Sequence, residues 1–462
     1  MANDSLVKKK KYLLLLGDII ILYFSLFLTL ALRYQNEFNG QIWEKHLWPF
    51  SVVFAVWLII FYIDDLYEID RSQSKISLLV RIMRSILISS LITIVFFYIG
   101  QNNIFSIKPQ RVLFIYILVS GTLIYLWRLT YDLATSSMAF NAVAIIGFND
   151  LVEQIIKEVN RKPQLGLRIK KIILEPGIEV LKDFESLVVN DDFKNLKLIC
   201  QDNDINTVIS TIHPRENDNL AKSLFECLPL KIGFFDITNF YEKITGKIPV
   251  ATIERVWFLE NLTEKSKKNY DTLKRFFDIT FSVFMLLVTM IFWPLIALVI
   301  KLESKGPVFF KQIRTGKDGK NFLAIKFRTM INNAEVNGPQ WAAKNDSRIT
   351  KVGKFFRKTR IDEIPQLINI LKNEMSLIGP RPERPEFVQE LEKEIPFYKE
   401  RLLVKPGLTG WAQVAGPAYG GSKEETLEKL QYDLYYIKNR SLALDLSIML
   451  KTIKTILTRK GQ

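Results

Sequence analysis

The sequence has few of the residues from which many catalytic and metal sites are built. The 462-residue chain contains two histidines, His46 and His213, and two cysteines, Cys200 and Cys227. With so few histidines, neither a His-containing catalytic triad nor a His-ligated metal is expected. The cysteines lie outside any CxxC or His-rich context, so neither a disulfide framework nor a zinc site is indicated. Any chemistry must therefore use carboxylates, arginine, lysine and a hard cation bound through oxygen.

Negative charge is also scarce relative to positive charge. The chain has 63 Lys and Arg against 48 Asp and Glu, which gives a net charge of +15. Such an excess predicts anionic partners: lipid headgroups, nucleotides or nucleic acid. A basic surface alone would allow a nucleic-acid binder or a non-catalytic membrane scaffold, but no nucleic-acid-binding motif is visible. We therefore expect no nucleic acid among the partners.

Long apolar runs dominate the first third of the chain. Each of four runs has about the length that crosses a bilayer: residues 12–34, 47–63, 76–100 and 112–127. The first is too long for a signal-peptide core and follows four lysines, which predicts a cytoplasmic N-terminus. An even number of spans returns the chain to the same side, and Arg128 directly after the fourth run agrees. Residues 1–135 are thus predicted to form four transmembrane helices.

A globular pattern begins at about Asn141. The buried-strand run "AVAIIGFND" precedes the helical pattern "LVEQIIKEV", which is how a βαβ unit starts. Further strand-like pieces, "LRIKKIIL", "TVISTI" and "LKIGFFDI", alternate with helical ones and predict a parallel α/β sheet. Of the GxGxxG fingerprint only Gly147 is present, so no bound dinucleotide is indicated. Residues 136–262 are predicted to form a Rossmann-like domain with a regulatory or structural role.

The apolar run at residues 276–300 is long enough to span a membrane, but it is unusual in two ways. Basic residues flank both of its ends, so neither end prefers the outside. Pro294 lies in its interior, where it kinks a helix at a cost of about 3 kcal/mol. A kinked helix over about residues 275–302 that enters and leaves by one face accounts for both features. A fifth span is the alternative, and it would place the basic C-terminal third outside.

The stretch "RIDEIPQ" places two carboxylates, Asp362 and Glu363, in the most basic part of the chain. Nearby cations favour an ionised carboxylate, which suits a nucleophile or a magnesium ligand and does not suit a general acid. Pro365 is tolerated in a first helical turn, so the pair is predicted at a helix N-terminus, where anions bind well. Neighbouring helix positions differ by about 100°, so the two carboxylates need different roles or a shared cation.

Five basic residues are candidates for binding phosphate. Arg357 and Arg360 precede the dyad and could clamp phosphate oxygens. Arg381 lies on the proline-stiffened turn "GPRPE". In the strand-like segment "FLAIKFRTM", a two-residue period places Lys326 and Arg328 on one face. Contact with anionic lipid alone is the alternative for the strand residues and Arg357. A carboxylate, several cations and a membrane dip together indicate phosphoryl transfer onto a lipid-borne acceptor.

Several ordered motifs carry a specific resemblance. The segments are "KRFFDI", "FWP", "GPVFFKQIRTGKDGKNFLAIKFRTM", "RKTRIDEIPQLINILKNEMSLIGPRPE", "KPGLTGWAQV" and "DLYYIKNRS". Together, over about residues 270–460, they resemble the bacterial sugar transferases, the polyprenyl-phosphate hexose-1-phosphate transferases. The preceding bundle and Rossmann-like domain resemble those of large members that start capsule, colanic acid or O-antigen synthesis.

The resemblance implies transfer of a sugar-1-phosphate from a UDP-hexose to undecaprenyl phosphate, with release of UMP and with Mg²⁺ as cofactor. It also implies a catalytic domain over residues 263–462, with a re-entrant helix and interfacial amphipathic helices. This domain would lie at the cytoplasmic face of the bacterial inner membrane. Anionic membrane lipids are further expected partners, and a homodimer is left open.

Residue roles follow from the same resemblance. Asp362 is implied as the nucleophile that forms a phosphosugar intermediate. Glu363 is implied as its partner, tied to magnesium or to positioning, and both carboxylates are candidate magnesium ligands. Arg357 and Lys326 are implied to act at the phosphates, and Arg381 at the nucleotide diphosphate.

The helix-breaking proline of the family corresponds to Pro294. Trp293 before it departs from the small polar residue of some members. This departure bears on the detail of the break and leaves the break itself expected.

Two other enzyme classes compete with this interpretation. A membrane-anchored nucleotide-sugar epimerase or dehydratase would need a GxGxxG fingerprint and a YxxxK pair. Tyr270 and Lys274 have that spacing, but they stand without the glycines. A metal-dependent glycosyltransferase is suggested by the DxD match at residues 202–204, which is a loop signal of low specificity.

Overall fold

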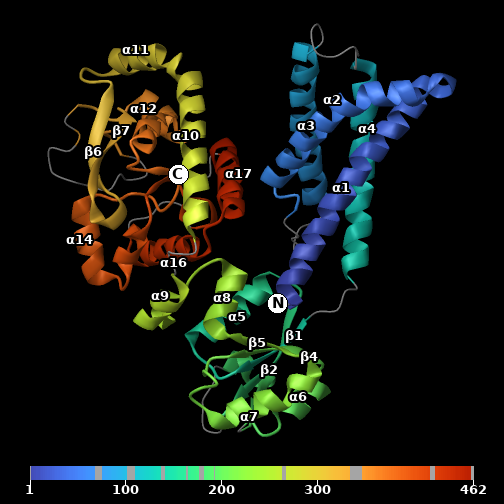
Figure 1. Ribbon diagram of the computed structural model, residues 1–462, viewed down its shortest axis with the longest axis vertical. Coiled ribbons are helices and arrows are strands. Elements are labelled where there is room, and N and C mark those ends of the chain that lie inside the picture. The colour runs from blue at the N-terminus through green and yellow to red at the C-terminus, as the bar shows by residue number, and fades with distance from the viewer. Residues whose placement is uncertain are drawn as a thin grey trace. The chain divides into compact units, whose positions relative to one another are not determined.

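Figure 1 shows the computed structural model, in which the chain divides into two units, Met1–Phe240 and Tyr241–Gln462. The structure describes residues 2–67, 75–100, 110–136, 141–162, 165–175, 182–191, 193–262, 267–332, 334, 346–416 and 422–458.

Four long helices begin the first unit: α1 (Ala2–Tyr34), α2 (Gly40–Ile63), α3 (Lys75–Gly100) and α4 (Gln110–Ser136). The segments within them that are long and apolar enough to cross a membrane are Lys11–Glu37, Gly40–Ile63, Leu78–Ile99 and Val112–Tyr131. The four predicted spans are therefore confirmed by length and composition. On α1, Leu22, Leu26 and Leu30 recur every fourth residue and are fully buried, as one helix face requires. Tyr116 of α4 packs against Trp57 of α2, with ring centroids 5.5 Å apart.

An ion pair lies inside this helical bundle. Asp18 of α1 and Arg128 of α4 approach to 2.6 Å, and their side chains are 0% and 4% exposed. Gly17 permits the close approach of α1 and α4, because a Cβ there would lie 2.2 Å from the Trp127 ring. The sequence analysis placed Arg128 directly after the fourth apolar run, and in the structure it lies within the candidate span Val112–Tyr131.

The parallel sheet predicted for the following residues is confirmed. Its strands are β1 (Asn141–Ile146), β2 (Leu167–Leu174), β3 (Val188–Asn190), β4 (Ile205–Ser210) and β5 (Gly233–Asp236). They pair in the order β3-β2-β1-β4-β5, all parallel. The helices between them are α5 (Asp150–Arg161), α6 (Leu196–Asp202) and α7 (Asp218–Glu226). The DxD match lies at the end of α6, on the turn into β4.

The local geometry of the β1–α5 turn accounts for its single glycine, and no bound ligand is needed to explain it. Gly147 has a φ of +82°, and a Cβ there would lie 2.0 Å from Thr211 Oγ1. The Asn149 side chain caps α5 by accepting from the amides of Leu151 and Val152, at 3.1 Å each. Two amides that a pyrophosphate would use therefore already have an acceptor.

This domain contains both cysteines of the chain. Cys200 and Cys227 are both free and buried. Burial raises the pKa of the Cys200 thiol to about 12, so at neutral pH it stays protonated and unreactive.

The second unit is mainly helical. Its first helices are α9 (Arg255–Asn261), α10 (Lys268–Met290) and α11 (Trp293–Glu303). An antiparallel hairpin of β6 (Phe309–Thr315) and β7 (Asn321–Phe327) follows. Next come α12 (Lys351–Thr359), the 3₁₀ segment η8 (Ile361–Gln366), α13 (Leu367–Leu371), β8 (Ser376–Ile378) and α14 (Pro385–Glu394). The chain continues through η9 (Tyr398–Leu403), β9 (Gly407–Thr409), α15 (Trp411–Ala415), α16 (Lys423–Asn439) and α17 (Leu442–Thr458).

The apolar segment before the hairpin is broken next to its proline. Helix α10 ends at Met290, α11 begins at Trp293, and the two are bent by 61° (Figure 1). Pro294 lies in the first turn of α11, where its missing N–H costs no hydrogen bond. Trp293 packs against Phe327 and Phe309 of the hairpin, with ring centroids 5.4 and 5.7 Å away.

The first half of α10 is fixed to the rest of this unit. Asp278 accepts a hydrogen bond from the Leu377 amide of β8 at 3.1 Å. Arg275 donates to the carbonyls of Ile370 and Leu371, at 2.7 and 3.0 Å, and so caps the C-terminal end of α13. The position of α10 therefore depends on the same short elements that surround the dyad.

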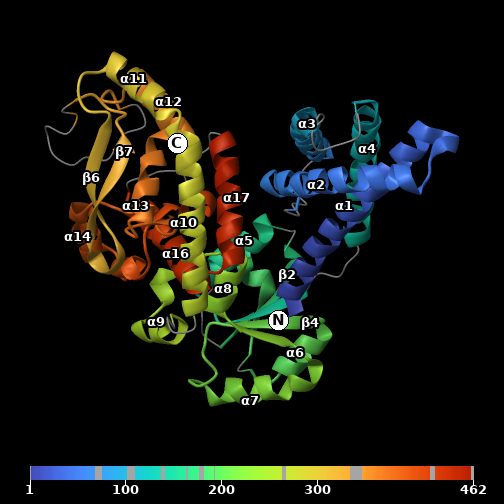
Figure 2. The same ribbon diagram turned by 45° about the horizontal axis from the view of Figure 1, so that its top comes forward.

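Helix α17 runs beside α10 in both views of the molecule (Figure 2). Asp445 of α17 accepts from Tyr270 at 2.8 Å, from Lys274 at 3.0 Å and from Tyr436 at 2.9 Å. The Tyr270 and Lys274 pair, considered above as an epimerase motif, therefore anchors α17 to α10. Its role is structural.

We predict that loss of one partner of the ion pair inside the bundle destabilises the protein more than loss of both partners. Asp18→Leu leaves a buried guanidinium uncompensated and should lower the free energy of unfolding by about 3–5 kcal/mol. Replacing both partners, as Asp18→Leu with Arg128→Met, should restore most of that loss. The measurement is thermal unfolding in a fixed detergent. As a control, Arg84→Ala removes a half-exposed partner of Asp64 and should cost less than about 1 kcal/mol. Equal losses for the single and double variants would contradict the prediction.

Candidate active site

The dyad lies between two short helical elements. Helix α12 ends at Thr359, Arg360 takes a left-handed conformation with φ +59°, and η8 begins at Ile361. Asp362 and Glu363 therefore occupy the first turn of η8, and each is only 6% exposed. The sharp change of direction at Arg360 turns both carboxylates away from solvent. Their negative charges must then be balanced within the protein.

Glu363 is balanced by three cations. Its Oε1 accepts from Arg381 Nη2 at 2.7 Å and from Lys326 Nζ at 3.0 Å, and it lies 3.7 Å from Arg360 Nη1. Burial alone would raise the pKa of this carboxyl. Arg381, Lys326 and Arg360 outweigh burial and hold the pKa well below its usual value. Glu363 is consequently an anion fixed in position.

Asp362 has the opposite balance. Burial and the adjacent Glu363 raise its pKa to about 6, against the lowering effect of Lys326, Arg357 and Arg360. The sequence argument counted only the cations and did not include the effect of burial. The carboxyl is still mostly ionised at neutral pH. Within the described part of the chain, its buried Oδ1 has no hydrogen-bond partner, so it is available to a ligand.

Arg357 is directed by a residue that the sequence analysis missed. Its Nε donates to Thr329 Oγ1 at 2.9 Å, just beyond β7. Helix α12 can approach this point because residue 353 is glycine, and a Cβ there would lie 2.0 Å from the Thr329 carbonyl oxygen. Thr329 in the "FRTM" motif and Gly353 in "KVGK" therefore set the place of Arg357.

Arg328 does not join the other predicted cations. Strand β7 ends at Phe327, so the two-residue period used above does not extend to residue 328. The Arg328 guanidinium instead donates to the carbonyls of Ser304 and Lys305, at 2.6 and 3.0 Å. It caps the C-terminal end of α11. A phosphate-binding role for Arg328 stays a prediction.

A buried asparagine aligns the strand with the dyad. Asn369 of α13 is fully buried, and its Oδ1 accepts from the Ile325 amide at 3.1 Å. Its Nδ2 donates to the Leu323 carbonyl at 2.7 Å and to Glu374 at 2.6 Å. These bonds hold β7 beside α13, so that Lys326 reaches Glu363. The only signal in the sequence is one polar residue inside the apolar run "LINIL".

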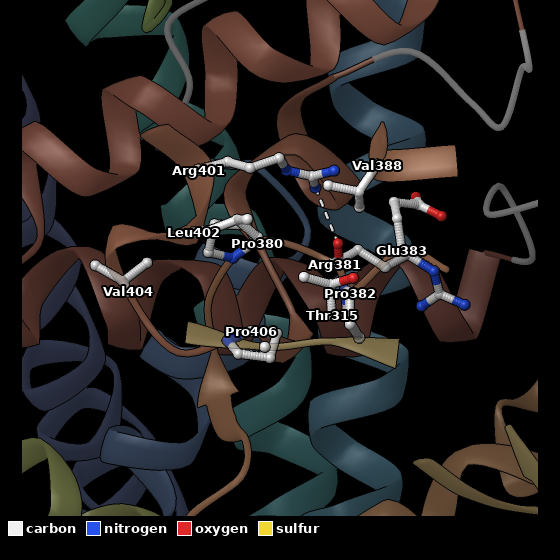
Figure 3. Close-up of a pocket in the computed structure, with 11 residues that line it drawn as sticks. Thr315, Pro380, Arg381, Pro382, Glu383, Val388, Arg401, Leu402, Val404 and Pro406 are labelled. Carbon is white, nitrogen blue, oxygen red and sulfur yellow. Dashed lines mark hydrogen bonds between the residues drawn. The ribbon is translucent and has the colours of Figure 1, made fainter. Parts of the chain in front are cut away.

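Arg381 is carried by a turn held by backbone hydrogen bonds. Gly379 N donates to the Thr409 carbonyl, Gly407 N to that of Pro380 and Thr315 N to that of Glu383, each at 2.9 Å. The turn also lines a small, open hollow (Figure 3). The structure thus brings together six of the predicted site residues: Asp362, Glu363, Lys326, Arg357, Arg360 and Arg381.

The carboxylates can be compared with what a metal requires. Among the described residues no group of three or more His, Cys, Asp or Glu side chains is placed to hold a metal ion. Mg²⁺ commonly uses one or two carboxylates together with substrate phosphates and water. Asp362 fits this pattern through its unpartnered Oδ1. Glu363 fits less well, because its Oε1 already has three cationic partners.

Two family models match the chain. The model described as bacterial sugar transferase matches residues 269–459, which include every residue of this site. The model described as a CoA-binding domain matches residues 62–231.

Curated relatives match over long segments. The chain is 43% identical over 252 residues to a UDP-N-acetylgalactosamine-undecaprenyl-phosphate N-acetylgalactosaminephosphotransferase of Aeromonas hydrophila, covering 53% of this chain and 58% of that protein. It is 30% identical over 342 residues to a UDP-glucose:undecaprenyl-phosphate glucose-1-phosphate transferase of Xanthomonas campestris pv. campestris, covering 71% and 69%. It is 39% identical over 336 residues to an undecaprenyl-phosphate glucose phosphotransferase of Komagataeibacter xylinus, covering 70% and 61%.

Proposed function

Since this chain belongs to the bacterial sugar transferase family, we propose that it transfers hexose-1-phosphate from a UDP-sugar to undecaprenyl phosphate and releases UMP. The observation that carries the proposal is the dyad, where a carboxylate with an unpartnered oxygen adjoins a fixed carboxylate among several cations. The names of the relatives support the same substrates. Such a product would start the assembly of an exopolysaccharide, capsule or O-antigen.

In the first step, an ionised oxygen of Asp362 attacks the β-phosphorus of the UDP-sugar. A bond forms between this oxygen and phosphorus, and the bond from phosphorus to the bridging oxygen breaks. The bridging oxygen keeps the electron pair and leaves with UMP. In the second step, a phosphate oxygen of the lipid attacks the same phosphorus and displaces the Asp362 carboxylate. Neither step requires a proton to be transferred. This agrees with the sequence, whose two histidines both lie outside the residues of this site.

The cations have separate tasks in this scheme. Lys326 and Arg381 hold Glu363, so that the backbone carrying Asp362 stays fixed relative to the attacked phosphorus. Arg357 and Arg360 act electrostatically on Asp362 and stabilise charge on the phosphate oxygens. Because a phosphoryl transfer depends mainly on positioning and charge, these contacts would supply most of the rate enhancement.

We further propose that Asp362, with Glu363 as the second predicted ligand, would hold Mg²⁺ together with the substrate diphosphate. When bound, the ion would offset charge on the leaving phosphate.

For the membrane, we propose that α10 and α11 enter and leave the cytoplasmic face of the inner membrane. Large apolar side chains are exposed along both helices and at the break between them, among them Leu287, Ile291, Leu298 and Leu302. Basic residues flank both ends of the pair. The lipid-borne phosphate could then reach the dyad from the bilayer side while the UDP-sugar arrives from the cytoplasm. The epimerase alternative is not favoured, since its tyrosine and lysine bind Asp445.

The activity is tested by UMP release from a panel of UDP-sugars with undecaprenyl phosphate. Asp362→Asn should reduce release by about 10³-fold or more, because the nucleophile is lost. Glu390→Gln, on the exposed face of α14, is the matched control and should leave activity unchanged. Chelation with EDTA should stop the wild-type reaction, and added Mg²⁺ should restore it. No UMP release with any donor would overturn the function.

The intermediate is tested with donor alone. Mass spectrometry should show a hexose-phosphate adduct at position 362, and labelled UMP should exchange into UDP-sugar without lipid. If UMP release requires the lipid and no exchange occurs, the lipid phosphate attacks the donor directly and Asp362 has another role.

The raised pKa of Asp362 predicts the pH dependence. Because the protonated carboxyl is not nucleophilic, kcat/KM should fall as the pH is lowered through about 6, by about tenfold per pH unit below it. An aspartate with an ordinary pKa would keep its activity to a lower pH. The measurement is kcat/KM across this range, with thermal unfolding at each pH as the control. An acid limb at the ordinary pKa of aspartate, 3.8, would contradict the assigned burial effect.

The membrane arrangement is tested with epitopes in intact cells. One at the C-terminus and one within residues 150–250 should both be protected from outside reagents. One inserted between the first two spans, at residues 38–39, should be accessible. If the C-terminal epitope is accessible while the epitope within residues 150–250 stays protected, α10 and α11 cross the membrane as one span.

A further inference from the structure

A second buried ion pair lies behind the turn that carries Arg381. Arg401 of η9 and Asp433 of α16 approach to 2.9 Å, and their side chains are 8% and 3% exposed. Burying two charges costs several kcal/mol per ion, and their mutual attraction offsets this only with good geometry and further hydrogen bonds. Such a pair therefore needs a reason other than stability.

The remaining donors of Arg401 reach two different elements. Its Nη1 donates to the Tyr398 hydroxyl at 2.6 Å, within η9. Its Nη2 also donates to the backbone carbonyl of Arg381 at 2.9 Å, which Figure 3 shows as a dashed line. One planar guanidinium thus connects α16, η9 and the turn. Lysine could not make all of these contacts in fixed directions.

The hydrogen bond from Arg401 is made to the backbone of Arg381, the same residue whose side chain binds the dyad. The other backbone bonds of the turn are at residues 379, 380 and 383, on either side of it. Arg401 holds the carbonyl of residue 381 itself. The side chain of that same residue reaches Glu363 Oε1 at 2.7 Å. An unbroken series of contacts therefore runs from Asp433 through Arg401 and Arg381 to Glu363.

We propose that Arg401, supported by Asp433, is a positioning residue for the proposed transfer reaction, on which this inference rests. It fixes the peptide of residue 381 so that the Arg381 side chain meets Glu363. It does not touch substrate. Without it, Arg381 would lose its fixed direction, Glu363 would be held less firmly, and Asp362 would be less well placed for attack.

The main variant is Arg401→Gln, measured by UMP release. We expect kcat to fall by about 10- to 100-fold, because small misplacements at a reacting centre have effects of this size. The KM for the UDP-sugar should change much less. Arg401→Lys keeps the positive charge next to Asp433 but cannot make all the contacts in fixed directions, so it should recover only part of the loss. Arg440→Gln is the matched control: it removes another buried guanidinium, next to α16 and paired with Asp271, and should leave kcat unchanged.

A double-mutant cycle separates positioning from general damage. In an Arg381→Ala background, Arg401→Gln should reduce kcat by no more than about twofold, because both changes remove the same function. Thermal unfolding of each variant shows whether it is folded. If Arg401→Gln does not fold, Asp433→Asn replaces it in the cycle. We then expect a smaller loss of kcat, and again little further loss in the Arg381→Ala background.

Additive losses in the cycle, or a wild-type kcat for the Arg401 variant, would overturn this inference and leave the proposed function intact. An absence of UMP release from the wild-type protein would overturn the proposed function and this inference together.

Discussion

The architecture of the catalytic unit depends on one buried carboxylate that must meet three cations at once. Glu363 is almost fully buried, and a charge in such a place is tolerated only when it is compensated. Its partners come from three separate places in the chain. Lys326 lies on strand β7, Arg381 lies on the turn after β8, and Arg360 is the left-handed residue directly before η8. None of these elements is long enough to be stable alone. The site therefore forms only when the hairpin, the turn and η8 are all in place. The geometry of the dyad thus depends on the folding of the whole unit.

The same environment gives two adjacent carboxyls opposite properties. Glu363 receives the cations and is an anchored anion, whereas Asp362 experiences burial and the charge of its neighbour and has a raised pKa. A single residue could not be both rigidly bound and free to form a new bond. Two neighbouring residues can divide these tasks, because successive positions of a short helix point in different directions.

The last two residues of β7 and the residue that follows them connect the helix break to the dyad. Lys326 holds Glu363, Phe327 packs against Trp293 at the break, and Arg328 caps the end of α11. Trp293 thus has a defined partner in this chain. A strand with alternating side chains can contact two layers at once. Any movement of the apolar helix pair would consequently be transmitted to the strand that carries Lys326.

The sequence by itself determined the features that depend on local pattern and composition. The four spans follow from run length, the parallel sheet from alternating strand and helix patterns, and the helix break from Pro294. The motif around "RIDEIPQ" also identified the dyad and most of its cations. Only the tertiary structure decided what depends on burial and on partners far along the chain. In the folded chain, burial raises the pKa of Asp362, Arg328 caps a helix, Asp18 pairs with Arg128, and Asp433 pairs with Arg401. Spacing in a sequence records neighbours along the chain, whereas desolvation and long-range pairing depend on neighbours in space.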